Sequence, residues 1–342
     1  MGSVKDLQII EEASGKSLGR GRFVFSDRYS VFDWGEMPDQ IDDKGKSLAL
    51  LSGYFLEKLK RKGIKTHYLG IMNEKDEVKT LDSIDIPSNS IEVSLVRVVK
   101  PALKNNIYNY TVYKTEQNNF LIPFEIIYRN RLPENSSVFK RLEKGEVTPE
   151  YFGLKEYPKA GQVLDIPLFD ISTKLEVNDR YITWDEAKEM AALSDEEIRK
   201  IRGITSKVND IITEDARRIG MINEDGKIEL AFNENREIIV VDTLGTLDEC
   251  RFNYKDHPVS KEIARKYYRQ TEWFQKVEKA KQADRFKWKE IVGEEPEKLP
   301  KEFKDLFAAM YKTTANQITG KEFFKGVPDM DTIIQGMEKY IK

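Results

Sequence analysis

The spacing of apolar residues predicts a helix flanked by strands in the first third of the chain. Leucine and phenylalanine recur at helical intervals over residues 48–59, and Gly63 follows where such a helix can end. Aromatic and β-branched residues over 21–34 predict strands that are broken in the middle of this range, and residues 64–70 and 90–100 are also rich in strand-forming side chains. This part of the chain is therefore predicted to combine a helix with a sheet.

Two helix-start patterns and a hairpin pattern organise the second half of the chain. Capping boxes at 183–186 and 194–197 precede helices, and the second helix is predicted to be long and to end near Gly220. The apolar alternation over 227–242 predicts a β-hairpin, and the last fifty residues read as a helical appendage. A chain of 342 residues is long enough for two domains, so we expect a hinge in the polar stretch 114–119.

The charge and the cysteine content of the chain mainly exclude certain partners and cellular compartments. A net charge of -3, with 56 Lys+Arg against 59 Asp+Glu, gives no basic field that would attract nucleic acid or an anionic membrane. The single cysteine, Cys250, excludes an internal disulfide and points to a reducing compartment. Neither a signal peptide nor an apolar run of membrane length is recognised. We therefore expect a cytoplasmic protein without nucleic-acid or membrane partners.

The scarcity of histidine narrows the chemistry further. His67 and His257 are the two histidines, and neither lies in a recognisable catalytic-triad or metal-binding context. An enzyme of this composition would rely on carboxylates, lysines, arginines and an oxygen-ligated metal. Those groups favour phosphoryl or acyl-phosphate chemistry, in which positioning and charge neutralisation dominate.

The predicted hairpin carries a candidate metal and phosphate site. If Glu234-Asn235 forms a two-residue turn, Lys227, Glu229 and Asp242 project from one face, with Lys227 opposite Asp242. The flanking residues would then face the core; they are Ile228, Leu230, Ile239 and Val241. Two carboxylates and a lysine suit Mg²⁺ and phosphate, whereas a solvated hairpin edge is the alternative. A three-residue turn would reverse one strand and remove the arrangement.

Arginines beside serines form a second candidate site. Arg129 and Arg131 end a predicted strand, and Ser136-Ser137 precede a short helical run. Forked guanidinium donors and hydroxyls at a helix start can hold a phosphate or carboxylate, although serines in this place also serve as simple helix caps. Arg251 is a third candidate for binding an anion.

Five segments in a set order resemble the SAICAR synthetase (phosphoribosylaminoimidazole-succinocarboxamide synthase) family over most of residues 1–280. They are FSDRYSVFDWGEMPDQIDDKGKSLALLSGYF, PFEIIYRN with SSVFKRL, PLFDISTKLEVND, DGKIELAF and VVDTLGTLDECRF. The resemblance implies an α+β fold of two lobes with ATP between them. Residues 1–122 would form a lobe that covers the nucleotide, 123–290 a lobe with the substrate and metal site, and 291–342 a helical extension.

The resemblance also implies a reaction and cofactors. The carboxylate of carboxyaminoimidazole ribonucleotide would be activated by ATP and Mg²⁺ as an acyl phosphate and captured by the amine of L-aspartate, giving SAICAR, ADP and phosphate. Such an enzyme would act in purine biosynthesis as a monomer or homodimer. A paralogue with another carboxylate and amine, or a non-catalytic nucleotide-binding relative, is the alternative; retention of Glu229 and Asp242 argues against the non-catalytic one.

Site residues follow from the same resemblance, position by position. Those that would bind ATP are Lys16, Glu125, Lys174, Glu229 and Asp242, the last two as ligands of Mg²⁺. Those that would act in catalysis are Lys227, Asp225 and Lys174. Those that would bind substrate are Arg129, Ser137 and Arg251 at the 5′-phosphate, Asp248 at the ribose or imidazole, and Asp179, with Lys44 as a further candidate.

The sequence departs from the family pattern around the substrate pocket. The stretch after Lys16 is shorter than the usual glycine-rich flap, and the loop before Ser137 has about two extra residues. Thr243 stands where the family generally has Glu, and 247–249 replaces Pro-Asp followed by small residues. These changes leave open whether a divergent member keeps the same substrate pair.

Overall fold

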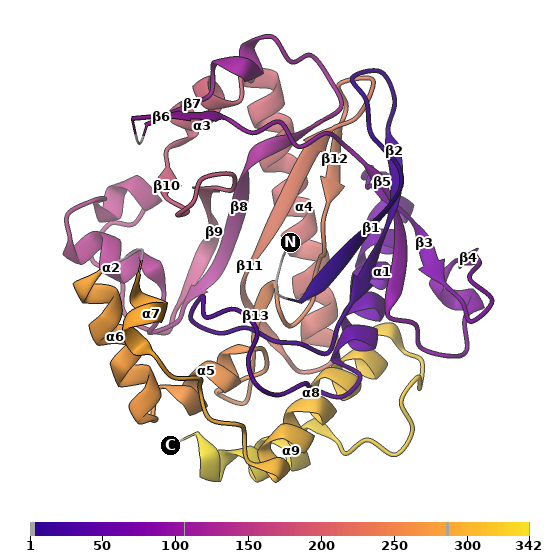
Figure 1. Cartoon of the computed structure of the whole chain (residues 1–342), viewed down its shortest axis with the longest axis vertical. Coiled ribbons are helices and arrows are strands. Elements are labelled where there is room, and N and C mark those ends of the chain that lie inside the picture. Colours follow the sequence, from indigo (N-terminus) through magenta and orange to yellow (C-terminus); the bar gives the residue numbers. More distant parts are fainter. Residues whose placement is uncertain (1–3, 106, 285–286, 342) are drawn as a thin grey trace.

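The chain folds around two main antiparallel sheets (Figure 1). The computed structural model describes residues 4–105, 107–284 and 287–341. The strands within these ranges are β1 (Lys5–Glu11), β2 (Gly19–Phe25), β3 (Tyr68–Met72), β4 (Val78–Lys79), β5 (Ser90–Leu95), β6 (Ala102–Lys104), β7 (Ile107–Asn109), β8 (Phe120–Leu132), β9 (Gln162–Thr173), β10 (Tyr181–Ile182), β11 (Ile222–Phe232), β12 (Ile238–Val241), β13 (Cys250–Tyr254) and β14 (His257–Pro258). The helices are α1 (Lys44–Arg61), α2 (Ser137–Glu143), α3 (Trp184–Met190), α4 (Asp195–Arg218), α5 (Glu262–Tyr268), α6 (Glu272–Ala283), α7 (Trp288–Val292), α8 (Lys301–Thr319) and α9 (Met330–Met337).

The first sheet has the order β1-β2-β5-β3-β4, and α1 packs on it. The predicted helix over 48–59 is confirmed, because the apolar residues of α1 are buried and Gly63 follows with φ +79. Asp27 holds the start of α1, since its carboxylate accepts a hydrogen bond from the backbone of Gly45 at 2.9 Å. The sheet and helix together bring the beginning of β1 toward the centre of the molecule (Figure 1).

The second sheet is built around β11. Its order is β10-β9-β8-β11-β13-β14, and β12 also pairs with β11. One edge of β11 pairs with β8, whereas the other edge pairs first with β13 and then with β12. Because the partner changes midway, the loop 242–249 enters beside the middle of β11, where the Lys227 backbone donates to the carbonyl of Glu249 at 3.2 Å.

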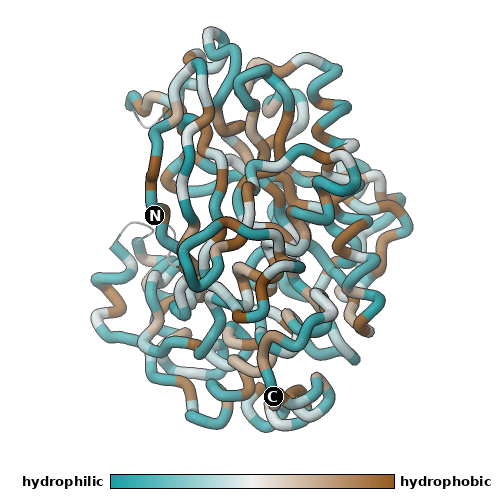
Figure 2. Tube along the Cα trace, turned by 90° about the vertical axis from the view of Figure 1, so that its right-hand side faces the viewer, coloured by the Kyte–Doolittle hydropathy of each residue, from teal (hydrophilic) through white to brown (hydrophobic). Residues whose placement is uncertain are grey.

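Helices cover the second sheet and close the base of the molecule. The long α4 packs on β8 and β11, and its predicted capping box is present at Ser194 and Glu197. The predicted C-terminal helical segment is also confirmed: α8 packs on α1 and α9 at the bottom of Figure 1. Figure 2 shows polar residues on most of the outer loops, with apolar stretches running through the interior. Among the described residues, no helix is both long and apolar enough to cross a membrane.

The two sheets are joined by β12. Residues 65–67 run beside this strand, where the His67 backbone donates to the carbonyl of Val240 at 3.0 Å and the Val240 backbone donates to Lys65 at 2.9 Å. One buried apolar cluster includes residues from both sheets and from α8. The predicted boundary at 122/123 falls inside β8, and the division into lobes stays a prediction.

The prediction of strands over 21–34 is right only in its first part. β2 ends at Phe25, and the residues after it form a loop with an isolated bridge between Arg28 and Gln40. The aromatic residues of this loop pack against helices: the Tyr29 and Tyr268 hydroxyls lie 2.9 Å apart, and the partly buried Phe32 ring lies 4.5 Å from that of Phe274. Their apolar character therefore reflects tertiary packing rather than strand pairing.

The predicted register of the β11–β12 hairpin is wrong by one residue. The Asn233 backbone donates to the carbonyl of Glu237 at 2.9 Å, so residues 234–236 form a three-residue turn in which Arg236 has φ 57. Glu229 therefore pairs with Val241. Ile239 and Val241 lie on the face of Glu229, in a small apolar cluster, and not on the core face predicted for them.

Removal of an aromatic ring from α8 should destabilise the whole fold. The Phe307 side chain is fully buried, and its ring centroid lies 6.0 Å from that of Tyr29. We expect Phe307→Ala to lower the free energy of unfolding by about 3–5 kcal/mol, measured by urea denaturation. The exposed Asp305→Ala on the same helix should change it by less than about 0.5 kcal/mol. Equal, small changes in both variants would show that α8 is not part of the folding core.

Candidate functional site

Charged side chains gather on one face of the second sheet. Three pairs of directly opposed residues on β8 and β11 point to this face: Arg129 with Asp225, Ile127 with Lys227, and Glu125 with Glu229. The intervening residues of both strands pack into the apolar core beneath α4. The alternation that buries one face of the sheet therefore places the polar residues of DGKIE and FEIIYRN side by side.

A lysine–carboxylate cluster occupies the middle of this face. Its members are Lys5, Glu125, Lys174, Lys227, Glu229, Asp242 and Glu249. The Lys227 ammonium donates to Glu125 Oε2 at 2.8 Å and to Glu229 Oε1 at 3.3 Å, and it lies 3.7 Å from Glu249 Oε2. Lys174, just beyond the end of β9, lies 2.5 Å from the same Glu229 oxygen. The polar loop after β9 thus directs one lysine into the cluster.

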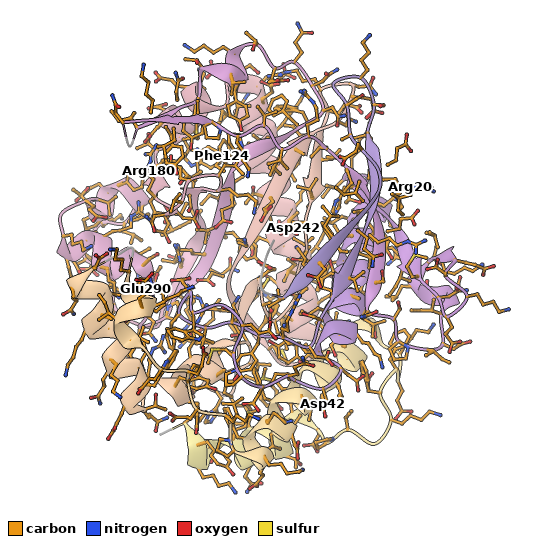
Figure 3. All side chains as sticks on the ribbon, in the orientation of Figure 1. Arg20, Asp42, Phe124, Arg180, Asp242 and Glu290 are labelled. Atoms are coloured by element: carbon orange, nitrogen blue, oxygen red, sulfur yellow. The ribbon has the colours of Figure 1, made fainter. Side chains whose placement is uncertain are left out.

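Asp242 joins the cluster through an unusual backbone conformation. In a continued strand it would point away from Glu229, but β12 ends at Val241 and Asp242 has φ 65. Its carboxylate forms an ion pair with Lys5, whose ammonium also interacts electrostatically with Glu229. Figure 3 shows Asp242 near the centre of the molecule in that view. The left-handed turn therefore brings the two predicted metal-binding acids to a common lysine, although the register predicted for them is wrong.

His67 supports this turn. The Nε2 atom of its ring lies 3.1 Å from the backbone carbonyl oxygen of Asp242. Burial, followed by the nearby Lys5, lowers the pKa of His67 to about 3, so the ring is neutral and its Nε2–H donates this bond.

The charges of the cluster stabilise one another against burial. Burial opposes the charged form of Glu229, but Lys227 and Lys174 hold its pKa below the ordinary value. Burial likewise opposes the charge of Lys227, yet its carboxylate neighbours raise its pKa above the ordinary value. At Lys5 burial is the larger effect and lowers the pKa to about 8, although the charges of Glu249 and Glu229 act to raise it. The cluster is thus a set of mutually paired charges in which Glu229 is buried and the lysines remain partly exposed.

An arginine cluster lies beside it on the same face. Its members are Arg129, Ser137, Arg141, Asp170, Tyr181, Asp225 and Arg251. Arg251 donates through Nε to Asp225 Oδ1 at 2.8 Å, and Arg129 reaches Asp225 Oδ2 at 3.5 Å. Arg129 also donates to the Ser137 hydroxyl at 3.0 Å. Two of the three predicted phosphate-binding residues, Arg129 and Arg251, therefore contact one carboxylate, Asp225, and Ser137 is joined to them through Arg129.

Arg251 also borders a cavity of about 340 Å³. Its further lining includes Arg131, Glu224, Asn253, Ser260, Glu262 and Lys266. Arg129, in contrast, is almost completely buried, and its Nε has no hydrogen-bond partner. Arg251 is therefore the more accessible of these two predicted anion-binding residues.

Two other predicted residues form a buried network. Lys44 donates to Asp248 Oδ2 at 2.8 Å, and the Tyr311 hydroxyl of α8 donates to Asp248 Oδ1 at 2.6 Å. Burial opposes the charge of Asp248, but Lys44 and Lys261 hold its pKa at about 2. Both carboxylate oxygens therefore have protein partners, which ties the loop 242–249 to α1 and α8.

Asp179 and Lys16 both lie in exposed loops, and Asp179 interacts electrostatically with Glu125, Lys227 and Lys174 of the cluster. Partial burial, followed by the charge of Glu125, raises the pKa of the Asp179 carboxyl to about 6. Lys16 lies in the exposed turn between β1 and β2. That turn follows the seven residues of β1, roughly 23 Å of strand, so the structure does not bring Lys16 into the cluster. Lys5, at the other end of β1, takes that place.

The donor set fits a hard divalent cation that brings its own oxygen ligands. Among the described residues, no group of three or more His, Cys, Asp or Glu side chains could hold a metal by itself. Glu229 and Asp242 supply carboxylate oxygen, and Mg²⁺ commonly uses one or two carboxylates together with substrate phosphates and water. The pair therefore suits a metal that arrives with a phosphorylated ligand.

The structure adds residues to the site that the sequence pattern missed. Lys5, His67 and Glu249 contact its members, but none belongs to a recognisable spacing. Gly226 has a steric role, since a Cβ there would lie 2.3 Å from the Tyr128 hydroxyl. The DGK spacing could have indicated this close contact, whereas the three long-range contacts could not be read from the sequence.

Comparisons with known proteins place these features in a family. The sequence profile of SAICAR synthetase matches residues 16–284. A chain from Archaeoglobus fulgidus with a provisional assignment as phosphoribosylaminoimidazole-succinocarboxamide synthase is 47% identical over 342 residues, the full length of both. The Thermoplasma acidophilum enzyme of that name is 30% identical, over 88% of this chain and 93% of the relative.

Solved structures agree in fold. SAICAR synthase from Saccharomyces cerevisiae, in complex with SAICAR, superposes with a TM-score of 0.64 at 22% identity and covers 94% of each chain. A SAICAR synthetase in complex with ADP superposes with a TM-score of 0.56 at 22% identity, over 87% of this chain and 99% of the other. The chain belongs to the SAICAR synthetase family, the ATP-dependent ligases that form SAICAR in purine biosynthesis.

Proposed function

We propose that this protein joins the carboxylate of carboxyaminoimidazole ribonucleotide to the amine of L-aspartate at the expense of ATP. The observation that carries the proposal is the lysine–carboxylate cluster next to the arginine cluster on one sheet face. The first suits a triphosphate and a reacting carboxylate, and the second suits the phosphate of a ribonucleotide. Family membership supports the same reaction.

The chemistry explains why such charges are needed. A carboxylate resists attack by an amine because its charge is delocalised and oxide is a poor leaving group. Transfer of the γ-phosphoryl group to a carboxylate oxygen releases ADP and gives an acyl phosphate, whose carbon the aspartate amine attacks with loss of a proton and expulsion of phosphate. All participants are anionic, so their approach requires fixed cations. Lys5, Lys174 and Lys227 would supply those charges.

The residues of the ATP subsite follow from the cluster. Lys5 and Lys174 would contact the phosphate oxygens of ATP. Lys5 would thus replace Lys16, which the sequence predicted for this contact. Glu229 and Asp242 would hold Mg²⁺, which would neutralise the phosphates when bound. Glu125 would remain paired with Lys227. The apolar cluster that borders Glu229 would pack against the adenine ring; its residues are Leu121, Ala231, Ile239 and Val241, with Val96 and Leu175.

The residues of the nucleotide-substrate subsite follow from the arginine cluster. Arg251 and Ser137 would bind the 5′-phosphate, and the buried Arg129 would orient Ser137. Lys227 and Asp225, two residues apart on β11, would lie at the reacting carboxylate. Asp248 would position the loop 242–249 rather than contact substrate, since Lys44 and Tyr311 occupy its oxygens. Asp179 would bind the ammonium group of L-aspartate.

The setting of the reaction follows from composition and family. With a net charge of -3, the enzyme would act on small molecules in the cytoplasm, without nucleic-acid or membrane partners. It would work as a monomer or homodimer.

A product assay tests the proposal directly. Incubation with ATP, Mg²⁺, carboxyaminoimidazole ribonucleotide and L-aspartate should release phosphate and form SAICAR. A coupled assay measures the phosphate, and chromatography measures SAICAR. Omission of either co-substrate should abolish both signals, because the acyl phosphate needs both partners to turn over. Phosphate release that is indifferent to L-aspartate would point to another amine and would overturn the proposal.

The metal carboxylates give a second test. Glu229→Gln and Asp242→Asn should each lower kcat by at least about 100-fold, because each removes charge that acts on the transferring phosphoryl group. Thermal unfolding should show folded protein in both variants. Glu237→Gln is a matched control, since this partly exposed glutamate of the same hairpin pairs with a surface lysine, Lys65, at 2.5 Å and accepts a hydrogen bond from the Asn233 side chain at 2.9 Å. A near-normal rate in either site variant would remove the metal assignment.

The raised pKa of Asp179 predicts a pH dependence. Its carboxylate is anionic above about pH 6 and becomes neutral below it, so it loses attraction for the substrate ammonium as pH falls. KM for L-aspartate should therefore rise by up to about tenfold per pH unit below 6. Asp179→Asn should show a high KM that does not change between pH 5 and 8. A wild-type KM that is flat over this range would contradict the assignment.

A further inference from the structure

Glu249 contacts Lys227 in two ways that no other carboxylate among the described residues combines. Its Oε2 lies 3.7 Å from the Lys227 ammonium, and its backbone carbonyl accepts a hydrogen bond from the Lys227 backbone at 3.2 Å. Glu249 therefore contacts both the backbone and the ammonium group of Lys227, at the point where β11 stops pairing with β13 and before it pairs with β12.

Thr243 holds the Glu249 side chain in place. The Thr243 hydroxyl donates to Glu249 Oε1 at 3.1 Å, which leaves Oε2 directed at Lys227. The turn between them is ordered by Thr246, whose hydroxyl accepts from the Glu249 backbone at 3.3 Å and whose carbonyl accepts from Cys250 at 2.9 Å. Thr243 and Glu249 are both largely buried, so the pair is shielded from competing water.

We propose that Glu249, held by Thr243, is the positioning residue for the Lys227 ammonium. The inference rests on the proposed function, in which Lys227 lies at the reacting carboxylate. Lys227 has three carboxylate neighbours in the described structure, and they are not equivalent. Glu229 is shared with Lys174 and is a proposed metal ligand, so its charge is committed elsewhere during the reaction.

The geometry explains why a second fixed carboxylate is needed. Glu125 alone would draw Lys227 toward β8, because it is the nearest partner at 2.8 Å. Glu249 approaches from the loop on the opposite edge of β11, so the two acids hold the ammonium between them. An ammonium on a flexible four-carbon stem gains a defined position only from such opposed contacts.

The Thr243–Glu249 contact suggests that the negative charge can be moved along the loop. A glutamate at position 243 would extend beyond the Thr243 hydroxyl into the space of the Glu249 carboxylate. The charge would then reach Lys227 from the same loop, provided that the side chain at position 249 is shortened to alanine so that this space is free. Moving the negative charge from position 249 to position 243 therefore gives a rescue experiment. If Glu249 had a purely structural role, this change would not restore activity.

The experiment compares five variants with wild type: Glu249→Gln, Glu249→Ala, Thr243→Val, the double variant Thr243→Glu with Glu249→Ala, and the control Glu237→Gln. Initial rates give kcat and the KM of each substrate, calorimetry gives ADP affinity without metal, and thermal unfolding gives stability. We expect Glu249→Gln to lower kcat by about 10- to 100-fold, as for a misplaced catalytic group, with ADP affinity and unfolding temperature near wild type. Thr243→Val should cost about fivefold in kcat, the equivalent of one hydrogen bond.

The double variant decides the question. It should recover at least about tenfold of the kcat lost in Glu249→Ala, because the charge beside Lys227 is restored. Wild-type kcat in Glu249→Gln, or a loss in Glu249→Ala that the double variant does not reduce, would overturn the inference. If wild type itself forms no SAICAR from the full substrate set, the proposed function fails instead, so the two failures are distinguishable.

Discussion

The pairing of partly buried lysines with buried carboxylates is the constraint on which this structure depends. Glu229 is buried on a strand face that it shares with the partly exposed Lys227, and a carboxylate left unpaired there would be costly. Each therefore requires partners from other parts of the chain: Glu125 from β8, Lys174 from the loop after β9, and Lys5 from β1. The contacts that satisfy these charges also assemble the site.

The same constraint links the site to parts of the chain that carry no reacting group. Lys44 at the start of α1 and Tyr311 in α8 both bind Asp248, and all three side chains are buried. The loop that bears Asp242 and Glu249 is thereby anchored to a helix outside the matched family region. The C-terminal segment is thus part of the scaffold of the site as well as of the core.

Much of the local structure was predictable because its causes are local. The helix over 48–59, the capping box at 194–197 and the hairpin over 227–242 all depend on side-chain periodicity or on residues three or four apart. The hairpin register was not predictable in this way. A two-residue and a three-residue turn were both compatible with the sequence 233–237, and the left-handed Arg236 distinguishes them.

The sequence by itself determined the chemistry of this protein: acids, lysines and arginines in a set order, almost no histidine, and a strand that alternates Asp225, Lys227 and Glu229 on one side. Only the tertiary structure decided which distant groups complete it. Lys5 rather than Lys16 reaches Asp242, and Glu249 reaches Lys227, because β1 and the loop 242–249 are brought to the middle of β11. Contacts between residues far apart in the chain depend on how whole elements pack, and periodicity along the sequence carries no record of that packing.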